Sequence, residues 1–315
     1  MAFKRVPQKF PSSIKEVKIG AGDKAVTFGG QSVLPFYSFD EKIKNPPLVG
    51  VEVSDLGPNR DLPELGKFYE GAKTIAEVAK KAATIPGANF VALSLESADP
   101  NGANKSIEDC VKLAKEVADA VGGFPLVIQG SKNVEKDGDL LVKIAEALDK
   151  KNVLLMSAKE DNHKKIAVGA VQAYGQNVAA ESAVDINLAK QLNVLIIQMG
   201  IKHENIVMNT GSASAGYGFE YVVSTMERIK LAALTQNDDK LQVPIITPVS
   251  EQTWNVGESF KSEAEAPKGW GPQEQRGIAM EIATASAVLA AGSDAVILRH
   301  PASVAAVSKL IAALV

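Results

Sequence analysis

The sequence of 315 residues is poor in the side chains that build metal clusters and disulfides, since it contains one cysteine and three histidines. A single cysteine forms no internal disulfide and suits a reducing cytoplasm. An iron–sulfur cluster needs several thiolates, so we expect the isolated chain to be colourless and free of iron. The histidines (His163, His203 and His300) are far apart and match no metal-binding spacing, and we expect His163 and His203 to be solvated.

Long apolar runs and an excess of positive charge are also missing. The apolar stretches, such as residues 295–298, are too short to span a bilayer. Residues 1–10 carry charge without a following apolar block, which is not the pattern of a secretory signal. A formal net charge of -3 argues against a surface for nucleic acid or for an anionic membrane. The composition therefore predicts a soluble cytoplasmic protein with a sizeable core.

Residues 1–47 are rich in proline and differ from the rest of the chain. Two strand-like pieces, residues 17–20 and 24–28, flank a turn at residues 21–23. We interpret this part as an N-terminal extension with a small hairpin, packed on the main domain or on a partner. The main domain is expected to cover residues 48–315.

From residue 48 onward, short apolar strands alternate with amphipathic helices. The strands are continuous apolar runs, as in a parallel sheet that is buried on both faces. Such alternation over about 270 residues is the size of a (β/α)8 TIM barrel, our predicted fold class. The rival is an open doubly wound sheet, but no strand precedes a nucleotide-type glycine fingerprint. The predicted strands are residues 48–55, 90–96, 125–131, 152–158, 177–182, 205–211, 243–250 and 294–300.

In a barrel, chemistry belongs to the loops that follow the strands. Two such loops are prominent: residues 209–218, rich in small residues, and residues 251–275, which hold both tryptophans, Trp254 and Trp270. Loops of such length in compact domains are commonly functional.

Covalent catalysis is poorly supported, because the chain has no G-x-S-x-G elbow. Lys132 and Lys159 follow predicted strands, but polar neighbours indicate open loops rather than a Schiff-base pocket. Cys110 falls on the inner side of a helix and is interpreted as a packed core thiol. Arg299 stands where many barrels bind phosphate, but no glycine pair accompanies it, and pairing with a neighbouring carboxylate is favoured.

The predicted barrel mouth is mainly neutral and polar, with carboxylates at the ends of three other strands (Asp55, Glu96 and Glu181). Small residues let main chain approach a broad ligand that is rimmed with amides. A flexible loop without any ligand is the alternative interpretation.

Residues 28–36 (FGGQSVLPF), 51–55 (VEVSD) and 208–221 (MNTGSASAGYGFEY) resemble the small subunit of the corrinoid iron–sulfur protein, whose archaeal counterpart is the delta subunit of acetyl-CoA decarbonylase/synthase. The resemblance covers nearly the whole chain and is most specific over residues 209–230. Asp161 to His163 begin like the cobalamin motif D-x-H-x-x-G, but Ile166 replaces its glycine, so we expect no axial ligand from this chain.

The resemblance implies a methyl carrier of the reductive acetyl-CoA (Wood–Ljungdahl) pathway. In that family, a large subunit holds a four-iron cluster and a corrinoid domain. The corrinoid receives methyl from methyltetrahydrofolate through a separate methyltransferase and passes it to acetyl-CoA synthase. The small subunit is expected to be non-catalytic, to cover the shared corrinoid, and to bind no metal itself. A pterin-binding methyltransferase, with Asp55 and Asn209 holding the pterin, and a lysine-dependent aldolase are the alternatives.

The expected corrinoid contacts come mainly from the loop after the sixth barrel strand. Its small and neutral residues let backbone amides reach a bulky macrocycle without burying a charge. The expected contacts are Asn209, Thr210, Gly211, Ser212, Ala213, Ser214, Gly216, Tyr217, Thr247 and Trp254.

Overall fold

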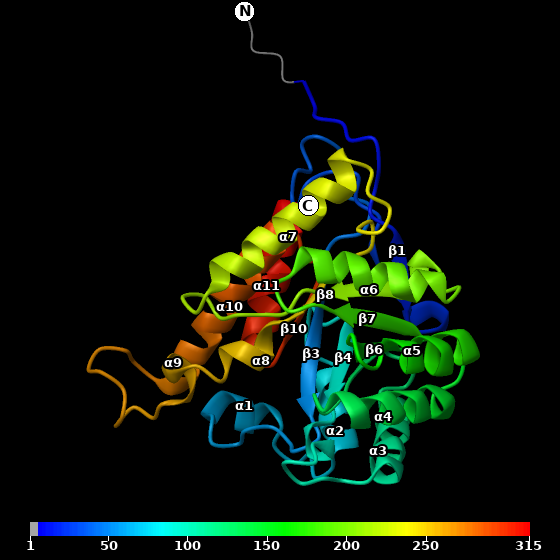
Figure 1. Ribbon diagram of the computed structural model, residues 1–315. Coiled ribbons are helices and arrows are strands. Elements are labelled where there is room, and N and C mark those ends of the chain that lie inside the picture. The colour runs from blue at the N-terminus through cyan, green and yellow to red at the C-terminus, as the bar shows by residue number, and fades with distance from the viewer. Residues whose placement is uncertain (1–5) are drawn as a thin grey trace, which may run out of the picture.

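The computed structural model describes residues 6–315, so the first five residues of the expected N-terminal extension lie outside the described part. Its centre is a ring of parallel strands (Figure 1). The strands of the ring are β3 (Leu48–Ser54), β4 (Phe90–Ser94), β5 (Leu126–Gln129), β6 (Leu154–Ala158), β7 (Asn177–Glu181), β8 (Ile206–Asn209), β9 (Ile246–Pro248) and β10 (Ala295–Leu298).

Neighbouring strands pair in the order β8-β7-β6-β5-β4-β3-β10-β9. The two ends of this sheet meet, because Met208 forms a parallel bridge with Ile245 and donates its backbone N–H to the Pro244 carbonyl at 2.8 Å. Each predicted strand contains one observed strand. The (β/α)8 barrel is therefore confirmed, and the open doubly wound sheet is excluded.

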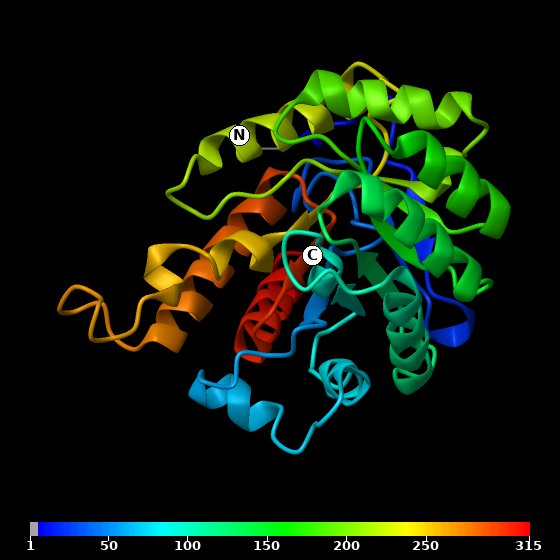
Figure 2. The ribbon, with the colours of Figure 1, turned by 60° about the horizontal axis from the view of Figure 1, so that its bottom comes forward.

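The helices surround the ring (Figure 2). Several begin where the sequence supplies a capping side chain: Thr74, Ser106, Asn133 and Asp185 each accept a backbone N–H from the first turn. No helix within residues 6–315 is long and apolar enough to cross a membrane. The α-helices are α1 (Pro63–Phe68), α2 (Ile75–Ala82), α3 (Ile107–Ala120), α4 (Val134–Ala147), α5 (His163–Ile166), α6 (Ile186–Gln198), α7 (Phe219–Thr235), α8 (Val249–Thr253), α9 (Gly257–Phe260), α10 (Gln273–Ala291) and α11 (Pro301–Leu314). Short 3-10 or π turns lie at η1 (Gly22–Lys24), η2 (Glu96–Ala98), η3 (Ala167–Gln172) and η4 (His203–Asn205).

Side chains of each strand alternate between two cores. One set packs outward against the helices, for example Val49, Val51 and Val53 of β3. The other set fills the barrel interior, where Phe90 lies so close to Gly50 that any Cβ at position 50 would collide with its ring. The interior set is Leu48, Phe90, Ala92, Val127, Leu154, Met156, Ala179, Val207, Ile246, Ala295 and Ile297.

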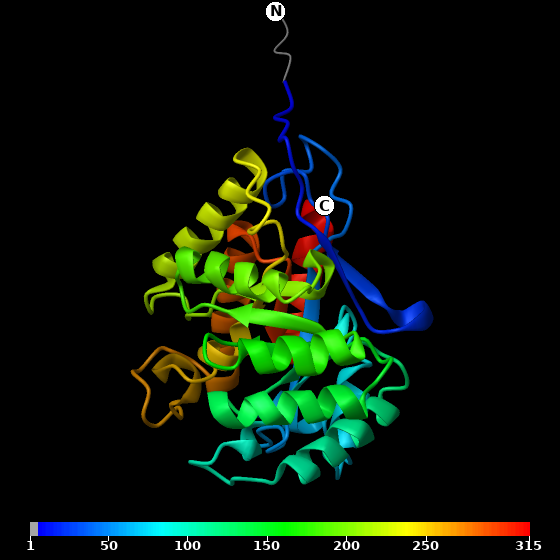
Figure 3. The same ribbon diagram turned by 45° about the vertical axis from the view of Figure 1, so that its right-hand side comes forward.

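A hairpin of β1 (Glu16–Ile19) and β2 (Val26–Gly29) closes the amino-terminal end of the barrel. Its apolar side chains join the interior core. Asn152 and Asn177, at the starts of the strands above it, donate their side-chain amides to the Lys18 carbonyl. Figure 3 shows this hairpin, in blue, on the opposite side of the barrel from α9. The expected hairpin is therefore present, and it packs on the barrel itself.

Candidate functional site

The uppermost interior layer of the barrel is polar, although the layers below it are apolar. Glu52 follows Leu48 and Gly50 on the inner face of β3, and Asn209 follows Val207 on β8. This change occurs at the carboxyl ends of the strands, the end at which TIM barrels bind ligands. The same inward positions on other strands hold Ser94, Gln129, Glu181 and Arg299.

A cavity of about 220 Å³ opens at this mouth between β5, β6, β7, β8 and the start of α8. Its walls carry more polar than apolar side chains. Its lining includes Ser94, Gln129, Lys132, Asp137, Ser157, Lys159, Glu181, Asn209, Gly211, Ser212 and Glu251.

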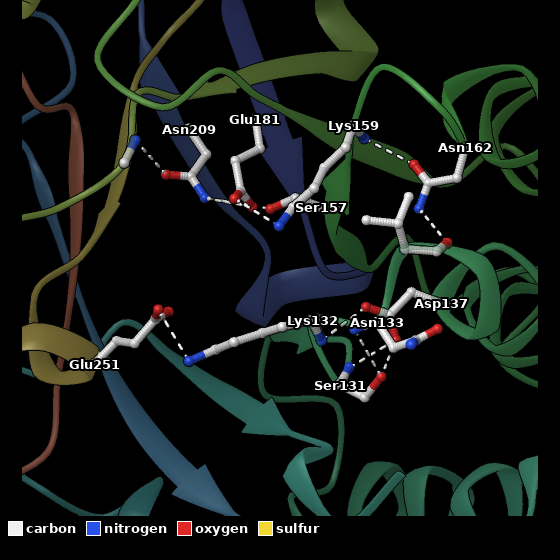
Figure 4. Close-up of polar contacts among 12 residues, drawn as sticks. Ser131, Lys132, Asn133, Asp137, Ser157, Lys159, Asn162, Glu181, Asn209 and Glu251 are labelled. Carbon is white, nitrogen blue, oxygen red and sulfur yellow. Dashed lines mark hydrogen bonds and ion pairs between the residues drawn. The ribbon is translucent and has the colours of Figure 1, made fainter. Parts of the chain in front are cut away.

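One wall of the cavity is a connected chain of polar contacts (Figure 4). Lys159 Nζ lies 3.0 Å from Glu181 Oε1, and Glu181 Oε2 accepts from Asn209 Nδ2 at 3.4 Å. Asn209 Nδ2 also donates to Ser157 Oγ at 3.2 Å, while its Oδ1 accepts the Gly211 backbone N–H at 3.0 Å. Both ends of the Asn209 amide are therefore engaged, which fixes its orientation.

The facing wall is built on Asp137, the buried carboxylate of α4. It accepts the backbone N–H groups of Ser131 and Lys132, at 2.7 and 2.9 Å, together with the Ser131 hydroxyl. Burial raises the pKa of Asp137 against these hydrogen bonds, which lower it. The loop so held directs Lys132 across the mouth, where its Nζ lies 3.0 Å from Glu251 Oε1 (Figure 4).

The structure corrects the interpretation of Lys159 as an open-loop residue, because its side chain is only 33% exposed, whereas the Lys132 side chain is 57% exposed as expected for an open loop. Both ammonium groups stand at the cavity, and each is paired with a carboxylate. The mouth therefore carries charged side chains, although each lysine–carboxylate pair has no net charge. His163 is corrected as well: it is buried, with Nδ1 2.6 Å from the Glu160 carbonyl, because it begins α5 against the core.

Of the predicted contact residues, three line the cavity: Asn209, Gly211 and Ser212. Thr210 and Ser214 are buried behind them, and neither hydroxyl has a hydrogen-bond partner within residues 6–315. Ala213 packs against the outer core.

The end of this loop is exposed and reaches away from the cavity. Gly216 and Tyr217 are both exposed, and the Tyr217 hydroxyl donates to Glu258 Oε2 at 2.6 Å. This bond ties the loop after β8 to α9. It also raises the pKa of Tyr217.

The two remaining predicted contacts do not reach the cavity. Thr247 is fully buried, with its hydroxyl 2.8 Å from that of Ser293. Trp254 packs on its own barrel: its ring stacks on His300 with the centroids 6.1 Å apart, and its Nε1 donates to Glu281 at 3.1 Å. The predicted loop of residues 251–275 contains α9, and Trp270 stands half-exposed under the guanidinium of Arg276.

The place where many barrels bind phosphate, after the last strand, is filled by a carboxylate of this chain. Glu281 of α10 is fully buried and accepts the backbone N–H groups of Arg299 and His300, at 2.6 and 3.2 Å. Burial raises the pKa of Glu281, whereas these bonds lower it. The amides that would hold a phosphate are thus already used, and the Arg299 side chain pairs with Glu52, as favoured from the sequence.

One cluster within residues 6–315, Glu64, Glu274 and His300, has the residue types of a metal site. Both ring nitrogens of His300 are already engaged within the chain. His300 Nδ1 accepts the Ala302 backbone N–H, so the proton lies on Nε2 and donates to Glu274 Oε1 at 3.2 Å. Burial lowers the pKa of His300 and so favours this neutral form. Glu274 also accepts two backbone N–H groups from the start of α1, so the cluster is explained as a helix cap.

Solved structures with the same fold include dihydropteroate synthases. The enzyme from Xanthomonas albilineans with bound 4-aminobenzoic acid superposes with a TM-score of 0.58 at 13% identity, over 95% of this chain and 98% of that one. The enzyme from Vibrio fischeri gives a TM-score of 0.58 at 10% identity, covering 94% and 97%. At such identities the likeness shows the barrel fold alone.

Sequence comparison is more specific. The curated delta subunit of the acetyl-CoA decarbonylase/synthase complex from Archaeoglobus fulgidus is 31% identical, over 98% of this chain and 70% of its own length. That from Methanothermobacter thermautotrophicus is 34% identical, over 94% and 75%. The family model described as CO dehydrogenase/acetyl-CoA synthase delta subunit matches residues 16–307. The resemblance noted in the sequence is confirmed: the chain belongs to the CO dehydrogenase/acetyl-CoA synthase delta subunit family.

Proposed function

We propose that this chain is the non-catalytic small subunit of a corrinoid methyl carrier, and that its barrel mouth covers a corrinoid held mainly by a larger partner. The observation that carries the proposal is family membership over nearly the whole chain, joined to a polar mouth whose two lysines are each paired with a carboxylate. The corrinoid, when bound, supplies the cobalt that accepts and releases the methyl group. The proposed partners are the cluster-bearing large subunit, a methyltetrahydrofolate methyltransferase and acetyl-CoA synthase, and the proposed location is the cytoplasm.

The residues at the mouth fit a group that rests over the barrel rather than inside it. A cavity of about 220 Å³ lies below the roughly 300–1,000 Å³ typical of sites that enclose a drug-sized ligand, so it cannot enclose a macrocycle. Two lining groups, Gln129 Oε1 and Ser212 Oγ, are buried without a hydrogen-bond partner in the described part of the chain. These groups can bond to amides on a corrin rim, either directly or through water.

The two ion pairs argue for a supporting role rather than a catalytic one. A Schiff-base lysine needs its side-chain nitrogen free to reach a substrate carbonyl, whereas here both lysine nitrogens are engaged with carboxylates. Glu181 and Glu251 stand within ion-pair distance of Lys159 and Lys132. What the pairs do supply is a fixed rim, because each joins loops from different strands.

A pterin-binding methyltransferase is the second candidate function, because dihydropteroate synthases share the barrel fold. One of its two expected ligands is committed elsewhere. Asp55 is buried, and its carboxylate accepts both the backbone N–H and the hydroxyl of Ser97, away from the cavity. Only Asn209 of that pair faces the mouth.

The decisive experiment compares the two ligands on the same protein. The chain would be purified alone and together with the large subunit, then titrated with methyltetrahydrofolate and with a corrinoid. We expect the isolated chain to bind no methyltetrahydrofolate and the two-subunit complex to retain stoichiometric corrinoid. Saturable methyltetrahydrofolate binding to the isolated chain, with methyl transfer to free corrinoid, would overturn the carrier assignment in favour of the enzyme.

A further inference from the structure

A second cavity, of about 350 Å³, opens beside the barrel mouth and is not used by the site described above. It lies at the carboxyl ends of β3, β4 and β10, under the segment that leads into α1. Figure 1 shows α1 beside the end of β3. Its lining residues are Glu52, Val53, Ser54, Leu56, Gly57, Pro58, Asn59, Leu65, Tyr69, Val78, Glu96 and Arg299.

The charged wall of this cavity begins with the ion pair of Glu52 and Arg299. Arg299 Nε lies 2.8 Å from Glu52 Oε2, and the side chains are 28% and 4% exposed, respectively. The guanidinium uses only Nε in this contact. Its two terminal amino groups make no hydrogen bond to any group within residues 6–315, so the cavity wall holds N–H donors that are open to a ligand.

The charged wall ends with a second carboxylate, Glu96, whose oxygens can accept hydrogen bonds from a ligand. No backbone or side-chain N–H in the described part of the chain donates to it, although the Ser54 hydroxyl is within reach. Burial, and then the nearby charge of Glu52, raise the pKa of Glu96. An N–H donor brought by a ligand would relieve this carboxylate.

The opposite wall is mainly apolar, with the hydroxyl of Tyr69 as a polar group. This wall is formed by Leu65 of α1, by Tyr69 directly after it and by Val78 of α2, and all three are almost fully buried. A ligand that fills this space therefore needs an apolar stem as well as a polar head.

From this arrangement we infer that the second cavity binds a primary carboxamide carried on a short methylene stem. The carboxamide oxygen accepts from the terminal amino groups of Arg299, its NH2 donates to Glu96, and the stem packs on Leu65 and Val78. A carboxylate would meet Glu52 and Glu96, and an ammonium group would meet Arg299, so a neutral head with both functions is favoured.

The inference rests on the proposed function for the source of the amide: the corrin rim carries such side chains, and both cavities open at the same end of the barrel. The second cavity would thus fix the rotation of the corrinoid above the mouth, which a flat macrocycle otherwise leaves undetermined.

The first test needs only this chain. Methyl signals of Leu65 and Val78 would be followed by NMR while propionamide, propionate or propylammonium is added. We expect saturable shifts with propionamide alone, reduced about tenfold or more in affinity by Glu96→Leu and less by Glu96→Gln. Glu70→Leu, an exposed acid outside the cavity, is the matched control. Stronger shifts with either charged analogue, or none with propionamide, would overturn the carboxamide assignment.

The second test uses the complex with the large subunit. Its affinity for dicyanocobinamide, which keeps the amide side chains, would be compared with that for cobyrinic acid heptamethyl ester, which lacks them. We expect a preference for the amide form that Glu96→Leu reduces about tenfold. If the preference is unchanged while propionamide still binds, the corrin is not the source and that part of the inference fails. If the unmodified complex retains neither corrinoid, the proposed function fails, and the first test alone decides the cavity.

Discussion

Gly211 offers a direct test of how the cavity wall is held. Its φ is +81°, a conformation that costs an L-residue about 1–2 kcal/mol. A Cβ at this position would have room, since its nearest neighbour would be the Ala183 Cα at 3.6 Å. We therefore expect Gly211→Ala to lower the free energy of unfolding by about 1–2 kcal/mol through backbone strain rather than through a clash.

In the Gly211→Ala variant, the backbone strain can be relieved by a peptide rotation, and this rotation would disturb the cavity wall. If the peptide before residue 211 rotates, its N–H leaves Asn209 Oδ1, a bond worth about 0.5–1.5 kcal/mol. Asn209 would then lose its orientation toward Ser157 and Glu181. Corrinoid retention by the two-subunit complex should weaken several-fold, and Gly211→Leu should weaken it more by adding bulk at the cavity rim.

The assay is urea unfolding of the isolated chain, together with corrinoid titration of the complex. Gly211→Asn is the control, because asparagine tolerates positive φ better than alanine does. It should lose less stability than Gly211→Ala. If the two variants lose equal stability, the left-handed backbone is not the reason for glycine here. If Gly211→Leu retains corrinoid like the unmodified complex, this loop is not the binding site.

Two further predictions concern buried charges away from the mouth. Lys230 and Asp294 pair at 2.6 Å with both side chains only 5% exposed, so Lys230→Met should cost about 3–5 kcal/mol in urea unfolding by leaving the carboxylate unpaired. Adding Asp294→Asn should restore part of that loss, and a single-variant cost below about 1 kcal/mol would show that water reaches the pair. Burial lowers the pKa of His300 in the folded protein. As pH drops below about 6.5, the imidazole is therefore protonated in the unfolded state before it is protonated in the folded state, and the folded state loses stability. His300→Asn, which keeps a capping acceptor, should therefore show a shallower loss of unfolding free energy between about pH 7 and pH 5; an unchanged slope would contradict the buried neutral imidazole.

The barrel was predictable because its strands are short apolar runs separated by helices with clear apolar stripes. Strand limits were less so, since β9 (Ile246–Pro248) is shorter than the predicted run of residues 243–250. The polar residue that ends most strands could have been used to predict the residues at the mouth, because residues i and i+2 of a strand point to the same face. Applied to Val127 and Ala179, that rule points to Gln129 and Glu181 as members of the mouth.

The rest of the site depends on contacts that sequence spacing does not carry. Polar neighbours made Lys132 and Lys159 look like open-loop residues. Each is held at the cavity by a carboxylate from another strand–helix unit: Glu181 of β7 pairs with Lys159, and Glu251 of α8 pairs with Lys132 across the mouth. Trp254 was expected at the mouth because it stands in a long loop. Gly277 of α10 leaves the space that its ring fills, and such a long-range fit is not visible in a single sequence.

The packed apolar layers of the barrel and the hairpin beneath them close the described structure at its amino-terminal end. Because these apolar layers lie beneath the 220 Å³ cavity, water or a small molecule in it exchanges through the mouth. A corrinoid bound over that mouth would block this exchange, so a small molecule already in the cavity would be trapped when the corrinoid binds. Binding would then be ordered: a small ligand of the cavity would have to bind before the corrinoid and could dissociate only after it.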